Sequence, residues 1–282
     1  MKLLRHGLAG AEKPGMVHSD GTLRDLSGVI PDISGDVLSD AGLAALAQID
    51  ADALPIVAPD TRLGPCVAGI GKFVCVGLNY SDHAAETGIP VPPEPIIFMK
   101  ANSAICGPND PIILPRGGDK TDWEVELAVI IGTRAKYVSI DQAMAHVAGY
   151  AVTNDVSERS FQMERSGQWT KGKSCDNFGQ LGPWLVTRDE ISDPQDLKLW
   201  LSVNGEMVQN GSTRTMVFGV AHLVSHISQF MTLHPGDVIS TGTPPGVGLG
   251  MKPQRYLKAG DVVELGIQGM GQQRQEVIPD PE

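Results

Sequence analysis

Short apolar segments, separated by turns at irregular intervals, constrain the fold of this chain more than any other feature of its sequence. Strand-like segments recur from residue 73 onward, and few stretches show the spacing of an amphipathic helix. A doubly wound sheet needs strands and helices in regular alternation, so this spacing disfavours it. The 33 Gly and 20 Pro residues supply turns between short strands. We therefore predict a mixed, β-rich α+β fold.

Most of the predicted elements lie in the second part of the chain. Helical spacing of Val220, Val224 and Ile227 predicts a helix over Met216–Met231. Another helix is expected over Ile140–Val147. The predicted strands are Phe73–Val76, Pro95–Met99, Glu124–Ile131, Gly149–Asn154, Trp184–Thr187, Lys198–Val203, Asp237–Thr241 and Asp261–Ile267.

The N-terminal stretch predicts a smaller unit. Ser39 or Asp40 can cap a short helix over Ser39–Gln48. Several prolines and glycines then indicate a linker over Leu54–Gly71. We predict a small N-terminal α+β domain with its linker over residues 1–70, and a larger domain over residues 71–282.

Charge and composition exclude several classes of protein. The formal net charge is −11, whereas general nucleic-acid binders cluster Lys and Arg against phosphates. No apolar segment approaches the roughly 18 residues of a membrane span, and none near Met1 forms a signal peptide. The four cysteines form no CxxC pair, which argues against a zinc knuckle and a disulfide framework. We expect a cytoplasmic protein without nucleic-acid or membrane partners.

The segment Glu124–Ile131 carries the sharpest local pattern. Because successive side chains of a strand point to opposite faces, Glu124 and Glu126 share one face while Val125 and Leu127 fill the other. Two buried carboxylates repel each other, and a bound cation would remove that cost. An exposed strand face with solvated glutamates is the commoner explanation of an isolated pair.

A third carboxylate favours a metal site. Asp155 directly follows the apolar strand Gly149–Asn154. Three carboxylates at strand ends make an all-oxygen site that suits Mg²⁺ or Mn²⁺ and also accepts Ca²⁺. Zinc fits less well, because no His or Cys accompanies them. Spacing alone leaves open both a metal site and a purely structural role.

The helix-compatible segment Asn79–Thr87 holds a candidate base. His83 and Glu86 are three residues apart, so on a helix Glu86 can orient His83 and raise its basicity. A general base requires such an arrangement. A surface histidine with a helical salt-bridge partner is the alternative.

Further polar side chains follow in turn-rich stretches. Arg159 and Gln162 come four and seven residues after Asp155, so a helical turn would put all three on one side. Lys171 and Lys173 lie in a Gly-containing stretch, where either could meet a carboxylate or an enolate. Surface lysine is the commoner meaning of such residues.

The loop Thr241–Gly250, which includes Gly242 and Thr243, could present backbone N–H groups to an anion. It does not open an obvious helix, as a dinucleotide-binding loop should, and it lacks the GK[ST] of a P-loop. A nucleotide site is therefore not indicated.

Taken in order, these segments resemble the fumarylacetoacetate hydrolase family. The resemblance implies a β-roll catalytic domain that is usually dimeric, so we expect a homodimer. Within the family, the chain is similar to bacterial hydrolases of 2,4-diketo-3-deoxy sugar acids, such as the L-rhamnonate and fuconate forms. The matching segments are Val76–His83, Phe98–Lys100, Asp122–Leu127, Asn154–Arg159, Lys171–Asp176, Val203–Gly205 and Gly236–Pro244.

The resemblance also implies a role for each candidate residue. The roles are three ligands of Mg²⁺ or Mn²⁺, a dyad that activates water, a lysine that stabilises an enolate, and lesser substrate contacts. In that order the residues are Glu124, Glu126 and Asp155; His83 with Glu86; Lys173; and Arg159, Gln162, Gly242 and Thr243.

One departure from the family pattern bears on the substrate. Val76 stands where some members carry a further metal-binding aspartate. The chain therefore resembles the three-carboxylate branch, which acts on pyruvate-type 2-oxo acids. The expected reaction cleaves the C3–C4 bond of a 2,4-diketo acid to pyruvate and a second acid.

Other functions are compatible with the same resemblance. They are a ureidoglycolate lyase and an oxaloacetate-type decarboxylase or hydratase. A binding protein on a decayed enzyme fold is the alternative outside enzymes, and the intact set of candidate residues counts against it.

Overall fold

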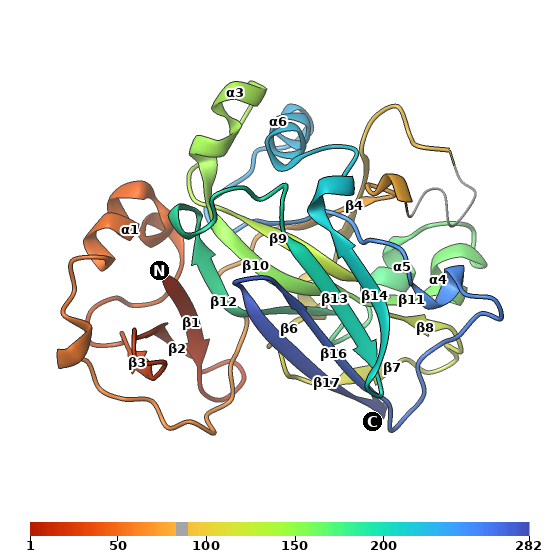
Figure 1. Ribbon diagram of the computed structural model, residues 1–282, viewed down its shortest axis with the longest axis horizontal. Coiled ribbons are helices and arrows are strands. Elements are labelled where there is room, and N and C mark those ends of the chain that lie inside the picture. Colours follow the sequence, from red (N-terminus) through yellow and green to blue (C-terminus); the bar gives the residue numbers. More distant parts are fainter. Residues whose placement is uncertain (83–89, 282) are drawn as a thin grey trace.

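Two β-sheets share the main apolar core of the protein (Figure 1). The computed structural model describes residues 1–82 and 90–281, in which one sheet has ten strands and another has five. The larger sheet runs in the order β3-β2-β1-β12-β10-β9-β15-β4-β5, with β6 paired to β12. Its strands are β1 (Lys2–His6), β2 (Lys13–Val17), β3 (Leu23–Asp25), β4 (Phe73–Gly77), β5 (Ile96–Lys100), β6 (Ile105–Cys106), β9 (Val125–Ile131), β10 (Val147–Asp155), β12 (Gly179–Thr187) and β15 (Val238–Ser240).

The smaller sheet and a short ribbon complete the β structure. The smaller sheet runs in the order β14-β13-β16-β17-β7. Its strands are β7 (Ile112–Leu114), β13 (Lys198–Val203), β14 (Glu206–Ser212), β16 (Val262–Ile267) and β17 (Gly271–Pro279), and the ribbon pairs β8 (Thr121–Asp122) with β11 (Ser157–Glu158).

Helices are few and short, so the predicted β-rich α+β fold is confirmed. The α-helices that lie wholly among the described residues are α1 (Asp40–Leu46), α3 (Ile140–Ala143), α4 (Arg159–Met163), α5 (Thr170–Lys173) and α6 (Val220–Phe230). None of the helices in the described ranges is long and apolar enough to cross a membrane. Single 3-10 turns lie at Gly35–Leu38, Ala51–Ala53, Asn102–Ala104, Met144–His146, Arg188–Glu190, Thr213–Thr215 and Gly248–Gly250.

Three predicted helices are shorter in the structure. The helix predicted over Ser39–Gln48 spans Asp40–Leu46, with Ser39 as its N-cap. The helix predicted from Met216 begins at Val220, because Thr213–Thr215 forms a 3-10 turn and Met216 is not helical. The helix predicted over Ile140–Val147 ends at Ala143 and continues only as a 3-10 turn.

The strands β9 and β10 form the centre of the larger sheet, and every residue in both is buried. In β9, Val125, Leu127 and Val129 face the core shared with the smaller sheet. Ala128 and Ile130 face a second apolar cluster on the opposite side. Alternation along the strand therefore puts Glu126 on the face opposite the main core.

The N-terminal part continues the same sheet. Strand β1 pairs antiparallel with β12, with Leu3 opposite Leu185. Leu3, Leu26 and Leu38 pack in the second cluster together with Ala128 and Leu185. Figure 1 shows these N-terminal elements at one end of the molecule and α4 and α5 at the other. The boundary near residue 70 stays a prediction.

Candidate active site

Three carboxylates meet where the start of β9 lies beside the end of β10. The two strands are antiparallel, so Thr153 lies opposite Glu126, and the backbone N–H of Asp155 donates to the carbonyl of Glu124 at 2.9 Å. One oxygen from each of Glu124, Glu126 and Asp155 lies within 4.8 Å of the others, and all three residues are buried. The structure thus brings the three predicted metal ligands together, and their binding of a metal stays a prediction.

Two buried lysines pair with these carboxylates. Lys173, the last residue of α5, places Nζ 2.8 Å from both Glu124 Oε2 and Asp155 Oδ2. Lys100, the last residue of β5, places Nζ 2.6 Å from Asp155 Oδ1. Burial acts to lower the pKa of Lys173, but Asp155 and Glu124 outweigh it and raise this pKa above its usual value. Lys173 is therefore a fixed positive charge at neutral pH.

Arg159 supports the same carboxylates from the start of α4. Its Nη2 donates to Glu124 Oε1 at 2.7 Å, and its Nε donates to Asp122 Oδ2 at 2.8 Å. Its Nη1 donates to Gln162 Oε1 at 3.1 Å. Burial alone would raise the pKa of Glu124, yet Lys173 and Arg159 lower it well below the usual value. Glu124 is therefore ionised.

Glu126 has a different environment. Its Oε2 accepts hydrogen bonds from Ser240 Oγ at 2.5 Å and from the backbone N–H of Gly242 at 2.8 Å. Gly242 has φ +99°, and an added Cβ would come within 2.8 Å of Asn79 Cβ, so only glycine suits this position. Burial, followed by repulsion from Asp155 and Glu124, raises the pKa of Glu126 well above its usual value.

The charges of the cluster fit a divalent cation. With all four buried carboxylates ionised against three buried cations, one negative charge is left over, and without a metal a proton on Glu126 neutralises it. A divalent cation among carboxylate oxygens would change the sum to one positive charge, and an all-oxygen site suits Mg²⁺ or Mn²⁺. The four carboxylates are Asp122, Glu124, Glu126 and Asp155, and the three cations are Lys100, Arg159 and Lys173.

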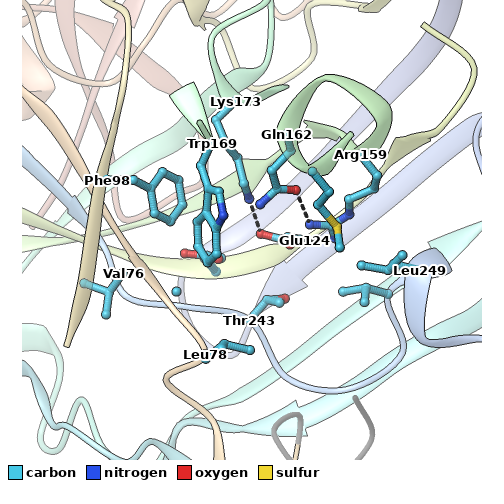
Figure 2. Close-up of a pocket in the computed structure, with 14 residues that line it drawn as sticks. Val76, Leu78, Phe98, Glu124, Arg159, Gln162, Trp169, Lys173, Thr243 and Leu249 are labelled. Carbon is cyan, nitrogen blue, oxygen red and sulfur yellow. Dashed lines mark hydrogen bonds and ion pairs between the residues drawn. The ribbon is translucent and has the colours of Figure 1, made fainter. Parts of the chain in front are cut away.

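A pocket opens onto this cluster. Glu124, Glu126 and Lys173 contribute to its lining, together with Gln162 and Thr243. Figure 2 shows Glu124 at the centre, with the side chains of Lys173, Gln162 and Arg159 directed toward it from the helical side. Ion pairs and hydrogen bonds hold these groups in place, so the pocket presents a preorganised polar surface to a ligand.

Of the other predicted site residues, some lie among the described residues and others do not. Thr243 lines the pocket, but its Oγ1 already donates to the carbonyl of Val125 at 2.9 Å and accepts from Gln209 at 2.9 Å. The predicted dyad of His83 and Glu86 lies outside the described residues. The substrate contacts assigned to Arg159, Gln162, Gly242 and Thr243 stay predictions.

Three residues of the site were not predicted as site residues from the sequence. Lys100, Asp122 and Ser240 hold the carboxylates or the arginine, as their contacts above show. The sequence contained two usable signals. Lys100 ends an apolar strand, where a lysine needs a buried partner, and Asp122 is two residues before Glu124 and so shares its face.

Comparison with known proteins places the chain among enzymes. The family model described as fumarylacetoacetate (FAA) hydrolase C-terminal matches residues 72–278. A protein of Burkholderia lata that carries only the general name of a hydrolase is 60% identical over 276 residues, which is 98% of each chain.

Solved structures agree with this match. A fumarylacetoacetate hydrolase from Exiguobacterium antarcticum is 37% identical, with a TM-score of 0.85 over 99% of this chain and 100% of that one. A maleylpyruvate hydrolase from Sphingobium sp. SYK-6, solved with manganese(II) and pyruvate, is 28% identical, with a TM-score of 0.81 over 99% of each chain. The sheet-rich architecture with few helices is therefore shared with both.

Proposed function

Since this chain belongs to the fumarylacetoacetate hydrolase family, we propose that it hydrolyses a carbon–carbon bond in a small 2,4-diketo acid with the aid of Mg²⁺ or Mn²⁺. The observation that carries the proposal is the buried trio of Glu124, Glu126 and Asp155 at a pocket, with Lys173 bridging two of them. The manganese(II) and pyruvate named for the Sphingobium maleylpyruvate hydrolase support it, because pyruvate would be one product here.

The cation would be held by Glu124, Glu126 and Asp155. Their oxygens lie close enough together for one ion, and a divalent ion can replace the proton that Glu126 otherwise retains. When bound, such an ion supplies Lewis-acid polarisation of a 2-oxo group and helps to orient the substrate. Ca²⁺ accepts the same oxygens, with a larger and more flexible coordination shell.

The residues of the chain supply the remaining chemistry. Lys173 keeps its proton and offers a buried positive charge to the carboxylate of the substrate and to the enolate that develops as the bond breaks. Gln162 lines the pocket beside it and can orient a substrate oxygen. Arg159 pairs with Glu124 and Asp122, and so fixes the carboxylates.

The proposed reaction consumes one water molecule. We assign the removal of a proton from water to His83, oriented by Glu86, an assignment that rests on the sequence. The hydroxide adds to the C4 carbonyl, the C3–C4 bond breaks, and C3 then takes a proton to give pyruvate. The second product is the carboxylic acid of the acyl group. The resemblance predicts that this group is a deoxy-sugar chain, but the reacting atoms are the same for any acyl group.

A product assay tests the proposal. Acetylpyruvate and longer 2,4-diketo acids are incubated with the Mn²⁺-loaded protein and with the same protein in EDTA. We expect equal amounts of pyruvate and a second acid, formed only with the metal. Release of CO₂ would indicate a decarboxylase instead. If no acid of the panel were consumed, with or without the metal, the hydrolase would be refuted.

A further inference from the structure

The pocket is polar at the carboxylate cluster and apolar elsewhere. Figure 2 shows Val76, Phe98 and Trp169 on one side of the polar groups and Leu249 on the other. Val76 is buried, and Phe98 packs edge to face on Trp169 with ring centroids 5.2 Å apart. A ligand held at the carboxylates would therefore place the rest of its length against apolar side chains.

The cations of the pocket are already committed. Among the described residues that line it, the cations are Arg159 and Lys173. Each guanidinium nitrogen of Arg159 donates to a protein acceptor, and Lys173 bridges Glu124 and Asp155. Neither is left over to pair with a second anionic group at the far end of a ligand.

The chain between β4 and β5 does not supply a lysine or an arginine either. Residues 79–95 contain no Lys or Arg and three acidic residues. This holds whatever the placement of residues 83–89. A ligand whose tail carries a carboxylate would thus be buried without a lysine or an arginine to pair with it, which is costly.

Local backbone geometry maintains the apolar wall. Leu78 lines the pocket with φ +54°, a left-handed conformation that is costly for a residue with a bulky side chain. Gly77 lies so close to Trp169 that an added Cβ would come within 2.5 Å of the indole. Glycine at residue 77 lets the indole pack there, and the strained leucine beside it adds an apolar side chain.

We propose that the acyl group of the substrate is uncharged and apolar, a short alkyl or aryl chain, rather than a dicarboxylate or a polyhydroxylated chain. This inference rests on the proposed function, since it takes the 2-oxo acid end to lie at the carboxylate cluster. A deoxy-sugar tail would leave several hydroxyls against apolar side chains, where each unpaired hydroxyl lowers affinity.

Binding of three six-carbon 2-oxo acids tests the inference without requiring turnover. The ligands are 2-oxohexanoate, 2-oxohexanedioate and 2-oxo-3-deoxygluconate, whose open-chain forms share the 2-oxo acid end and differ only in the tail. Calorimetry on the Mn²⁺-loaded full chain is expected to show 2-oxohexanoate binding about 10–100-fold more tightly than the other two. Equal or tighter binding of either polar ligand would overturn the inference.

Variants of Leu249 locate the effect in the wall. Leu249 is half-buried in the 3-10 turn Gly248–Gly250, so its side chain can be changed without opening the core. Leu249→Lys should improve binding of 2-oxohexanedioate at least tenfold relative to 2-oxohexanoate, whereas Leu249→Met should keep the wild-type order. An unchanged ratio in Leu249→Lys, with correct folding by circular dichroism, would count against the proposed wall.

The failure of each proposal has a separate signature. Hydrolysis of 2,4-diketo acids with no preference for an apolar tail would overturn this inference and leave the proposed function standing. The expected binding order without hydrolysis of any 2,4-diketo acid would leave this inference standing and overturn the hydrolase. Failure to bind any of the three ligands would overturn this inference, and the product assay would still decide the proposed function.

Discussion

At the scale of single residues, Glu126 differs from the other two carboxylates of the cluster. Glu124 and Asp155 each pair with a lysine, whereas none of the described ion pairs involves Glu126. Burial first, and then Asp155 and Glu124, raise its pKa well above the usual value. Without a metal the folded chain therefore retains a proton on Glu126 that the unfolded chain releases.

That proton makes the stability of the metal-free protein depend on pH. Because the folded pKa is raised, this contribution is full below the unfolded pKa and is lost as pH rises toward the folded pKa, by at most about 1.4 kcal/mol per pH unit. Glu126→Gln has no such proton, so its thermal midpoint in EDTA should fall less between pH 5 and pH 8. Scanning calorimetry of both proteins measures the difference.

The exposed Glu206 provides the matched control, since its side chain is 69% exposed and pairs only at the surface with Arg255. Glu206→Gln should keep the wild-type dependence on pH. Glu126→Gln should also lose the upward shift of the midpoint that Mn²⁺ produces in the wild type, because binding to the folded state alone stabilises it. Identical curves for Glu126→Gln and the wild type would show that Glu126 neither retains the proton nor holds the metal.

Lys173 and Lys171 form a natural pair for a second prediction. Both lie in α5, but Lys173 is buried against the carboxylates and Lys171 is exposed. Lys173→Met should lower kcat on the order of a hundredfold or more, the usual effect of removing one preorganised charge at a reacting oxygen.

The lysine variants are compared by steady-state pyruvate release and by Mn²⁺ binding. Lys171→Met should retain wild-type turnover, and Lys173→Met should still bind Mn²⁺, because it removes a positive charge beside the ligands. Equal turnover in the two variants would exclude Lys173 from the reaction.

What the sequence could predict at this scale depended on periodicity. Glu124 and Glu126 were placed on one face by strand alternation, which needs no tertiary information. The choice of Lys173 over Lys171 could not come from spacing, because both occur in the same polar stretch and only tertiary packing buries one of them. That choice came from the resemblance.

At the scale of elements, strongly apolar strands were predictable and amphipathic ones were not. β9 and β10 are buried throughout, so their apolar runs reveal them. β17 (Gly271–Pro279) reads as polar and was missed. Its Gln273 and Gln275 are nonetheless buried, because other parts of the chain satisfy their amides. A sequence does not show where such partners lie.

Gln275 links β17 to the site. Its Oε1 accepts from Asn154 Nδ2 at 3.1 Å, and Asn154 Oδ1 accepts from the backbone N–H of Glu124 at 3.0 Å. Gln275 Nε2 donates to the carbonyl of Pro108 at 2.7 Å. Gln275→Leu should lower the free energy of unfolding by about 1–3 kcal/mol, since it leaves buried polar groups without partners.

Urea unfolding monitored by fluorescence measures this change. Gln272 lies in the same strand but is exposed, so Gln272→Leu should stay within about 0.5 kcal/mol of the wild type. Equal stability of the two variants would mean that the buried amide network contributes nothing to the fold.

At the scale of the whole molecule, the N-terminal part and the site-bearing part are joined by more than the linker between them. They share one sheet through β1 and β12 and one apolar cluster. Near residue 70 the sequence changes from a stretch rich in proline and glycine to apolar strand segments, but pairing between strands that are far apart in the chain leaves no local signal. The predicted boundary therefore follows a change in amino-acid composition, whereas the sheet and the apolar cluster continue across it.

Arg62 lies in the linker and connects both parts. Its Nε and Nη2 donate to Asp110 at 2.8 and 2.6 Å, and its Nη1 donates to Glu12 at 3.0 Å and to the carbonyl of Gly7 at 3.2 Å. The hydrogen bonds to Asp110 contribute most to raising the pKa of Arg62 above its usual value. The Arg62 side chain is 29% exposed, and its pair with Asp110 is bidentate. Such a pair should stabilise the folded state more than a surface ion pair does.

We therefore expect Arg62→Met to lower the free energy of unfolding by about 1–2 kcal/mol, a range reduced to allow for partial screening by solvent. Arg274→Met is the control, because Arg274 is 54% exposed and meets Glu276 only at 3.4 Å, and it should change stability by less than about 0.5 kcal/mol. If Arg62 joins two parts of one cooperative unit, Arg62→Met will unfold in a single transition at lower urea. Two separate transitions, with the metal-dependent one unchanged, would instead show that the N-terminal part unfolds on its own and that the shared sheet does not couple it to the site.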